Sequence, residues 1–234
     1  MTIKIKERVD GVIERFETAN PHPQTALHYG TPYQFLVAVL LSAQCTDERI
    51  NMVTPALFAA YPTPLEMSRA SEEEILSYIR SVTYPNSKAR YLKQSAESIV
   101  QDYGGEVPET LRELMSLQGV GRKTANVYLS VIIGEPRIGV DTHVYRVSRR
   151  IGLVPQTANN VLKVEESLMR RIPREYWNRI HHWLILHGRQ ICFARSPHCP
   201  TCPISDYCRH YARHYGSDGV EKKIDYHPLS HFSS

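Results

Sequence analysis

The 234-residue sequence lacks the long apolar segments that membrane insertion requires. Its longest unbroken apolar run, residues 35–41, has seven residues, whereas a membrane-spanning helix needs about 20. The N-terminal residues, MTIKIKER, contain no apolar stretch of the kind that a secretory signal carries. We therefore expect a soluble protein that works inside the cell. Residues 216–234 are polar and lack periodicity, so they predict a loose tail.

Cysteine is scarce and unevenly placed. Of five cysteines, Cys45 stands alone, and four lie within 17 residues near the C-terminus. Without a secretory context a disulfide framework is not expected, and a tight cysteine cluster in a reducing compartment more often holds metal. We interpret Cys45 as an inert core thiol.

The spacing of the clustered cysteines bears on which metal they would bind. Six, two and five residues separate Cys192, Cys199, Cys202 and Cys208. Zinc ribbons usually use two pairs of cysteines that are each two residues apart, and this sequence has one such pair. Four cysteines also suit a [4Fe–4S] cluster. The spacing favours iron–sulfur and leaves zinc as an alternative.

Positive charge is concentrated in one segment. The net charge is +4, but residues 170–216 contain eight arginines, no lysine and two acidic residues. A basic segment beside a nearly neutral one is typical of a surface that faces phosphates. Charge alone fits a solvated, arginine-rich pair of helices equally well.

Helical patterns dominate and predict an all-α fold. Residues 71–74 and 110–113 each read as a capping box at a helix start. Residues 35–41 fit a central helix that is buried all round. Apolar residues at helical spacing continue over residues 177–188, where Gly188 is the predicted C-cap.

A glycine-rich turn joins two apolar helical segments at residues 117–125, LQGVGRKTA. One helix is expected to end at Leu117 and the next to begin near Arg122, with Gly119 and Gly121 allowing a tight turn through backbone conformations that other residues avoid. Backbone amides at such a helix start can bind a phosphate oxygen. The two glycines alone would fit an ordinary helical corner, but the basic residues that follow favour a helix–hairpin–helix that binds DNA phosphates.

Two residues that could carry chemistry lie 18 positions apart. Lys123 lies at a predicted helix start, where the helix dipole disfavours its protonated form and so favours a nucleophilic amine. Asp141, the predicted N-cap of the next helix, could accept a proton or stabilise positive charge, although an anion there also favours the protonated lysine. In the alternative interpretation, Lys123 only binds phosphate and Asp141 only caps a helix.

Together these motifs resemble the endonuclease III family of helix–hairpin–helix DNA glycosylases and AP lyases. The likeness covers about residues 5–212. Its most characteristic segments are LSAQCTD (41–47), NSKA (86–89), GVGRKTAN (119–126), VDTHVYR (140–146), HGR (187–189) and the cysteine loop.

The resemblance implies two all-α lobes. One would be a six-helix barrel with the hairpin, residues 24–136, and the other an iron–sulfur domain formed by residues 1–23 and 137–215. Damaged double-stranded DNA would lie in the cleft between the lobes, where Lys123 and Asp141 would face each other.

It also implies a bifunctional enzyme of base excision repair that removes oxidised pyrimidines. After the damaged nucleotide is flipped out, Lys123 would attack the sugar C1′ and displace the base. The resulting imine would then allow β-elimination, which cuts the strand 3′ to the lesion. Asp141 would support the first step. The cluster would do no chemistry in this scheme and would hold a basic loop in place.

Further site residues follow from the same resemblance. Gln44 would fill the gap left by the flipped base, and Asp47 and His143 would line the damage pocket or its rim. A helix-end cap is the alternative for Gln44, and a surface helix residue is the alternative for His143. Amides and side chains of the hairpin residues Gly119, Gly121 and Arg122 would contact DNA.

The sequence departs from the family pattern at two places. Gln118 replaces the proline that usually precedes the hairpin glycine. Thr83-Tyr84-Pro85 replaces a usual Gly-Leu-Tyr, whose leucine is wedged into the DNA stack, so we expect Tyr84 to be the wedge and to act by stacking.

Two rival functions are weighed against this one. A monofunctional glycosylase for mismatched adenine or thymine usually lacks the lysine at position 123. A non-catalytic DNA-binding protein with a structural metal loop would not need both Lys123 and Asp141. The favoured hypothesis is a monomeric enzyme in the cytoplasm, associated with the nucleoid.

Overall fold

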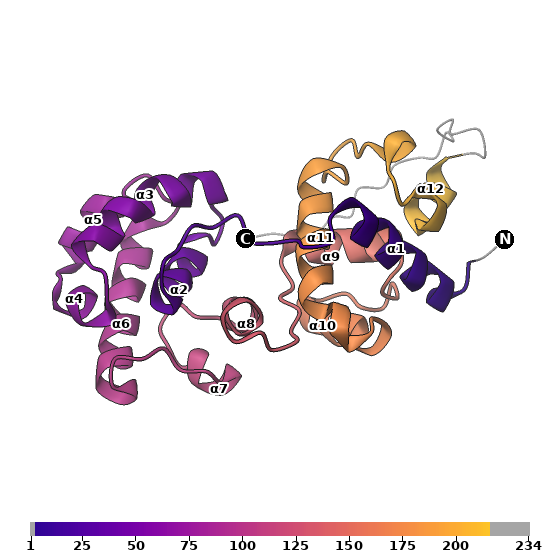
Figure 1. The fold of residues 1–234 in the computed structure, drawn as a ribbon. Helices are drawn as coiled ribbons and strands as arrows, with labels where there is room; N and C mark the ends of the chain where they lie inside the picture. The colour runs from indigo at the N-terminus through magenta and orange to yellow at the C-terminus, as the bar shows by residue number, and fades with distance from the viewer. Residues whose placement is uncertain (1–2, 216–234) are drawn as a thin grey trace. The chain divides into compact units, whose positions relative to one another are not determined.

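A computed structural model describes residues 3–215, which form helices joined by turns and no strand (Figure 1). The prediction of an all-α fold is confirmed. The predicted tail, 216–234, lies outside the described residues. The α-helices are α1 (Ile5–Ala19), α2 (Pro32–Leu41), α3 (Asp47–Ala60), α4 (Pro64–Arg69), α5 (Glu72–Ile79), α6 (Pro85–Tyr103), α7 (Leu111–Leu114), α8 (Arg122–Tyr128), α9 (Thr142–Ile151), α10 (Val161–Arg171), α11 (Trp177–Gln190) and α12 (Arg209–His214). A π-helical turn, η1 (Leu129–Ile133), follows α8, and 3₁₀ turns are η2 (Arg174–Tyr176), η3 (Cys199–Thr201) and η4 (Ser205–Tyr207).

The described chain divides into two compact units by its internal contacts. The first unit comprises residues 22–141 and 173–182, and the second comprises residues 3–21, 142–172 and 183–215. Helix α11 therefore contributes its first residues to the first unit and the rest to the second. The domain boundaries expected from the resemblance, at residues 24 and 136, stay predictions.

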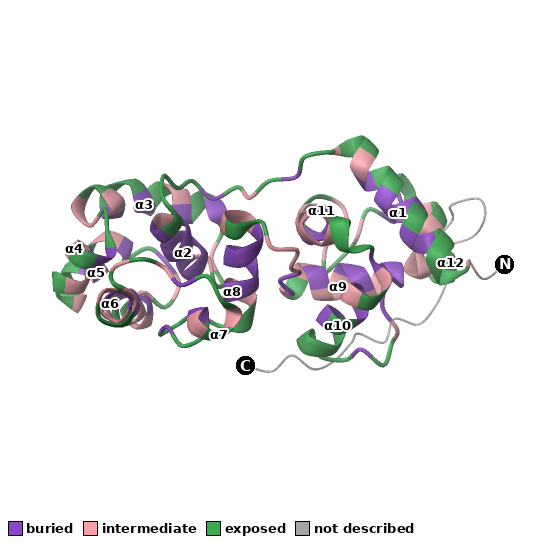
Figure 2. Ribbon diagram, turned by 60° about the horizontal axis from the view of Figure 1, so that its bottom comes forward, coloured by how far each residue is buried: buried purple, intermediate pink, exposed green. Residues whose placement is uncertain are grey.

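Helix α2 forms the centre of the first unit, as Figure 2 shows by its burial. Every residue from Phe35 to Leu41 is buried, which confirms the prediction of a buried helix. The hydroxyl of Thr31 accepts a hydrogen bond from the Gln34 amide, and Pro32 begins the helix with a suitable φ. Around this helix pack α3, α6 and α8.

The capping predictions for the first unit hold in part. Ser71 and Glu74 form the predicted capping box of α5. The Thr110 hydroxyl caps α7 by accepting from the Glu113 amide. However, α7 ends at Leu114, so the prediction of a helix to Leu117 is wrong. The chain beyond α7 follows tighter turns, because the Leu117 amide donates to the Leu114 carbonyl and the Val120 amide to the Leu117 carbonyl.

The second unit packs α1 against the C-terminal part of α11 and sets α9 against α10 and α12. The ring of Phe16 in α1 lies 5.9 Å from that of Trp183 in α11. Gly188 does not cap α11, because the helix continues to Gln190, and that prediction is wrong. None of the described helices is both long and apolar enough to cross a membrane.

Candidate functional site

The hairpin between α7 and α8 has the predicted form, but its two glycines differ. Gly119 has φ +77°, and a Cβ there would lie 2.8 Å from Cβ of Tyr91, so only glycine fits. Gly121, the N-cap of α8, has an ordinary φ of −86° and open space around it. The prediction that both glycines need unusual backbone conformations is therefore wrong for Gly121. Its lack of a side chain leaves the start of α8 accessible.

Lys123 lies half-buried in the first turn of α8, and the segment that leads to Asp141 is bound to the same helix. The Asn126 side-chain amide donates to the Ile138 carbonyl at 3.3 Å. At Gly139 the backbone is so close to α8 that a Cβ would lie 2.8 Å from Val127 Cγ2 and 3.3 Å from the Lys123 carbonyl oxygen. The structure thus places the two predicted catalytic residues on contacting segments of the first unit.

A histidine that the sequence analysis did not select lies beside this contact. His181 of α11 is fully buried and is hydrogen-bonded to the backbone of Gly139. Burial lowers the pKa of His181 well below 6.5, and the neighbouring charges of His182 and Lys123 lower it further. The imidazole is therefore neutral. In the sequence, His181 and His182 are adjacent residues of a basic, amphipathic helix, and no local pattern indicates that His181 is buried.

Gln44 and Tyr84 share a backbone conformation that is rare for residues with a side chain. Both have φ 55°, in the left-handed region. Tyr84 is 63% exposed, and it precedes α6 as its N-cap residue. The hydroxyl of Thr83 donates to the Gln44 carbonyl at 2.9 Å, so the two turns are in contact. Strained backbone of this kind is concentrated at functional sites. Asp47 follows on α3, where its side chain is mostly buried.

His143 lies half-buried at the start of α9, in the second unit. An Arg146 guanidinium nitrogen lies 3.1 Å from the imidazole Nδ1. The same guanidinium donates to the carbonyls of Gly188 and Cys192. These contacts hold His143 between α9, α11 and the start of the cysteine loop.

The four clustered cysteines line one cavity in the second unit. Arg150 lies 3.6 Å from the Cys192 sulfur, and His187 Nε2 lies 3.6 Å from the Cys202 sulfur. Burial raises the pKa of Cys202 to about 12 and that of Cys208 to about 11. Thiolates in such a place need cationic iron beside them, so the donor set fits an iron–sulfur cluster. Among the described residues, no three His, Cys, Asp or Glu side chains converge as ligands of one ion.

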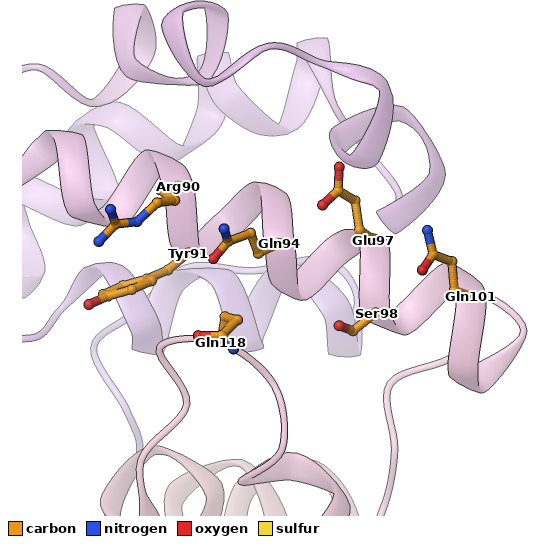
Figure 3. Close-up of a pocket in the computed structure, with 7 residues that line it drawn as sticks. All are labelled: Arg90, Tyr91, Gln94, Glu97, Ser98, Gln101 and Gln118. Carbon is orange, nitrogen blue, oxygen red and sulfur yellow. The ribbon is translucent and has the colours of Figure 1, made fainter.

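An open groove of about 670 Å³ lies beside the hairpin (Figure 3). Helix α6 forms one wall, and Gln118 contributes from the hairpin, where the family usually has proline. The other lining residues are Arg90, Tyr91, Gln94, Glu97, Ser98 and Gln101. The substitution at residue 118 thus adds an exposed amide to a polar surface next to Gly119.

Comparison with known proteins accounts for nearly the whole described chain. Residues 37–174 match the HhH-GPD superfamily base excision DNA repair proteins, and residues 192–208 match the iron–sulfur binding domain of endonuclease III. Endonuclease III of Rickettsia conorii is 44% identical over 203 residues, which cover 87% of this chain and 96% of that protein. Endonuclease III of Escherichia coli K12 is 43% identical over 199 residues, 85% of this chain and 93% of that protein.

A solved structure agrees. The trapped endonuclease III–DNA covalent intermediate, in an estranged-adenine complex, matches with a TM-score of 0.85 and 42% identity, and the match covers 91% of this chain and 99% of that one. The chain belongs to the endonuclease III family. Its activity is accordingly that of a bifunctional DNA glycosylase and AP lyase of base excision repair. The predicted cofactor is confirmed as an iron–sulfur cluster, since the matched binding domain begins and ends at the outer cysteines.

The structure places most of the residues selected from the sequence in three groups. The hairpin brings Gly119, Gly121, Arg122 and Lys123 together. Gln44 and Tyr84 meet at a second place, and the four cysteines at a third. His181 was not selected from the sequence, because its backbone partner at Gly139 is distant in the chain and no local pattern reveals it.

Proposed function

We propose that Lys123 is the nucleophile of this enzyme and that its substrates are oxidised pyrimidines in double-stranded DNA. The observation that carries this assignment is the contact of α8 with the backbone at Gly139. That contact keeps the segment ending in Asp141 beside the helix that presents the Lys123 amine. A lysine at a helix start and a carboxylate on a neighbouring segment form the pair that amine-based glycosylase chemistry requires.

In the proposed reaction the neutral Lys123 amine attacks C1′ of the flipped nucleotide, and the bond from C1′ to the base breaks. The base leaves with its electron pair and takes up a proton. The C1′–O4′ bond then breaks, with O4′ taking up a proton that the nitrogen has lost, and the ring-opened sugar remains bound to Lys123 as an imine that acidifies the C2′ proton. Loss of that proton expels the 3′ phosphate by β-elimination, and water then releases Lys123. Asp141 stabilises positive charge on the sugar in the first step or accepts a proton from Lys123.

The DNA contacts are assigned to three places. Amides at Gly119, Gly121 and Arg122 hold a backbone phosphate at the start of α8. Gln44 and Tyr84 insert into the stack, for which Tyr84 is suitably exposed. Asp47 and His143 bind the damaged nucleotide. Support comes from the solved relatives in complex with DNA, one covalent and one non-covalent. The enzyme acts as a monomer in the cytoplasm, at the nucleoid.

Cys192, Cys199, Cys202 and Cys208 are the proposed ligands of a [4Fe–4S] cluster. When bound, the cluster would supply no catalytic step and would offset part of the negative charge of the four thiolates. The chain itself ties the loop to α9, because Arg150 donates to the carbonyl oxygens of Phe193 and Ala194. These hydrogen bonds keep Arg195, the arginine between Cys192 and Cys199, at a fixed position for contact with phosphates.

A borohydride trapping experiment tests the nucleophile. The iron-loaded protein is incubated with a duplex that contains one oxidised pyrimidine, and borohydride then reduces any imine to a stable amine. We expect a covalent protein–DNA band that Lys123→Ala abolishes and Lys93→Met, a control on α6, retains. Circular dichroism verifies that both variants are folded. A wild-type protein that releases the base without forming a band would overturn the imine mechanism.

A further inference from the structure

Lys88 joins the two turns proposed to insert into DNA. It lies on α6, four residues after Tyr84, and its ammonium donates to the Leu41 carbonyl at 2.8 Å and to the Ala43 carbonyl at 2.6 Å. Those carbonyls belong to the end of α2 and to the turn that presents Gln44. With the Thr83 hydroxyl bonded to the Gln44 carbonyl, three hydrogen bonds connect the start of α6 to this turn.

The burial of Lys88 indicates that it holds these turns rather than contacts solvent. Only 5% of the residue is exposed, and burial lowers the pKa of its ammonium. A charged donor in this place satisfies carbonyls at the C-terminal end of a helix and interacts favourably with the negative end of its dipole. Hydrogen bonds of a charged donor are stronger than those of a neutral one.

The turns that Lys88 connects contain two residues whose unusual backbone conformation the Lys88 contact has to maintain. Gln44 and Tyr84 both have φ 55°, a conformation that costs energy and persists only where the surroundings impose it. We define these two residues as the wedge pair. We propose that Lys88 is a positioning residue that holds the wedge pair as one rigid unit, so that Gln44 and Tyr84 enter the DNA stack together. This inference rests on the proposed function of the wedge pair.

The same helix offers a matched control. Lys93 donates to the carbonyls of Ser68 and Ala70, at 3.1 and 2.9 Å, near the end of α4. It therefore makes the same kind of double contact to backbone carbonyls away from the wedge pair. Because Lys93 also pairs with Glu97 at 3.0 Å, Lys93→Met removes at least as many polar contacts as Lys88→Met. Lys88→Met and Lys93→Met each remove two such bonds and keep an unbranched side chain.

Insertion is measured with a duplex in which fluorescent 2-aminopurine lies opposite a tetrahydrofuran abasic analogue. This analogue forms no imine, so the fluorescence rise reports unstacking independently of Lys123. We expect Lys88→Met to slow the fluorescence rise about tenfold, which corresponds to the loss of one charged hydrogen bond. Lys93→Met should stay within about twofold of the wild type. Thr83→Val, the milder second variant, should slow it in the same direction.

An assay on a second substrate distinguishes a loss of wedge-pair positioning from a general loss of protein structure. Borohydride trapping on a single-stranded abasic oligonucleotide needs Lys123 but no insertion into a duplex, so Lys88→Met should lose there much less than in the fluorescence assay. Equal losses in both assays, or a fluorescence rise like that of Lys93→Met, would overturn the positioning role. A wild-type signal that Gln44→Ala and Tyr84→Ala leave unchanged would instead refute the wedge pair itself. Failure of the wild type to trap the oligonucleotide would count against Lys123 alone.

Discussion

Gly188 lies directly against His143: a Cβ on residue 188 would lie 2.9 Å from the imidazole Nδ1. The same Cβ would lie 3.1 Å from Val147 Cγ2, so α11 and α9 are packed without space for a side chain. We expect Gly188→Ala to displace the ring and to lower the free energy of unfolding by about 1–3 kcal/mol, as overpacking does. Denaturant unfolding measures this loss, and binding to an abasic-analogue duplex should weaken with it.

A double-mutant cycle identifies the cause of that loss. In a His143→Ala background the ring is absent, so Gly188→Ala should cost less than it does in the wild type. An unchanged cost would show that the clash with the ring is not responsible and that the backbone of α11 responds instead.

The two hairpin glycines form a natural pair for comparison. Gly119 has φ +77° and touches Tyr91, whereas Gly121 has φ −86° and no atom within 4 Å of a built Cβ. We expect Gly119→Ala to reduce the free energy of unfolding by about 1–3 kcal/mol and Gly121→Ala by less than about 1 kcal/mol. Thermal unfolding of both variants measures the difference. Similar losses would contradict a special conformation at Gly119.

Local features of this fold could be predicted from the sequence. The capping box of Ser71 and Glu74 joins residues three positions apart, so its hydrogen bonds are specified by the sequence itself. The start of α8 after Gly121 and that of α9 after Asp141 were also predicted, from a glycine turn and from an N-cap residue type. The four clustered cysteines were selected as ligands by spacing and by family resemblance, and the family match over residues 192–208 confirms the kind of cofactor.

Features that depend on distant partners could not be predicted. Lys88 lies in the NSKA segment of the family resemblance, but it donates to carbonyls 47 and 45 residues away, and no local pattern indicates that its ammonium is buried. Gly188 reads as a helix end because glycine often terminates helices, but here its size allows contact with His143. In both cases the deciding interaction lies between helices far apart in the sequence.

Acid should destabilise the protein through two adjacent histidines of α11, the buried His181 and the half-buried His182. Burial lowers the pKa of His182 from 6.5 to about 4 and that of His181, beside it, well below 6.5. At a pH between its folded-state pKa and the unfolded-state value of 6.5, each histidine is protonated in the unfolded chain but not in the folded chain. Its contribution to the free energy of unfolding is therefore complete above pH 6.5 and declines as the pH falls. The expected slope is about 1.4 kcal/mol per pH unit for each histidine. Urea unfolding of the wild type and of His182→Gln at about pH 7 and pH 5 should give a shallower decline for the variant, and equal declines would contradict the assignment.

Asp141 should matter more for base removal than for the reaction at an abasic site. Asparagine is as good an N-cap as aspartate, so Asp141→Asn should fold normally while losing the negative charge. We expect base release from an oxidised-pyrimidine duplex to slow by about 10²- to 10⁴-fold in single turnover. Strand cleavage at a preformed abasic site should decline much less, since the base has already left. Equal declines would show that Asp141 acts on Lys123 itself rather than on charge that develops with base departure.

Iron content should separate the four clustered cysteines from Cys45. Cys202 is half-buried in the cavity that the other three share, whereas Cys45 is half-buried against the core of the first unit. Cys202→Ala leaves three thiolates for a cluster that takes four, so we expect loss of iron and of the brown colour. Cys45→Ala removes a thiol of the same kind outside the cavity, and it should retain both. If Cys202→Ala kept a full complement of iron, another ligand would have to replace the lost sulfur, and His187, whose Nε2 lies 3.6 Å from it, would be the residue to substitute next.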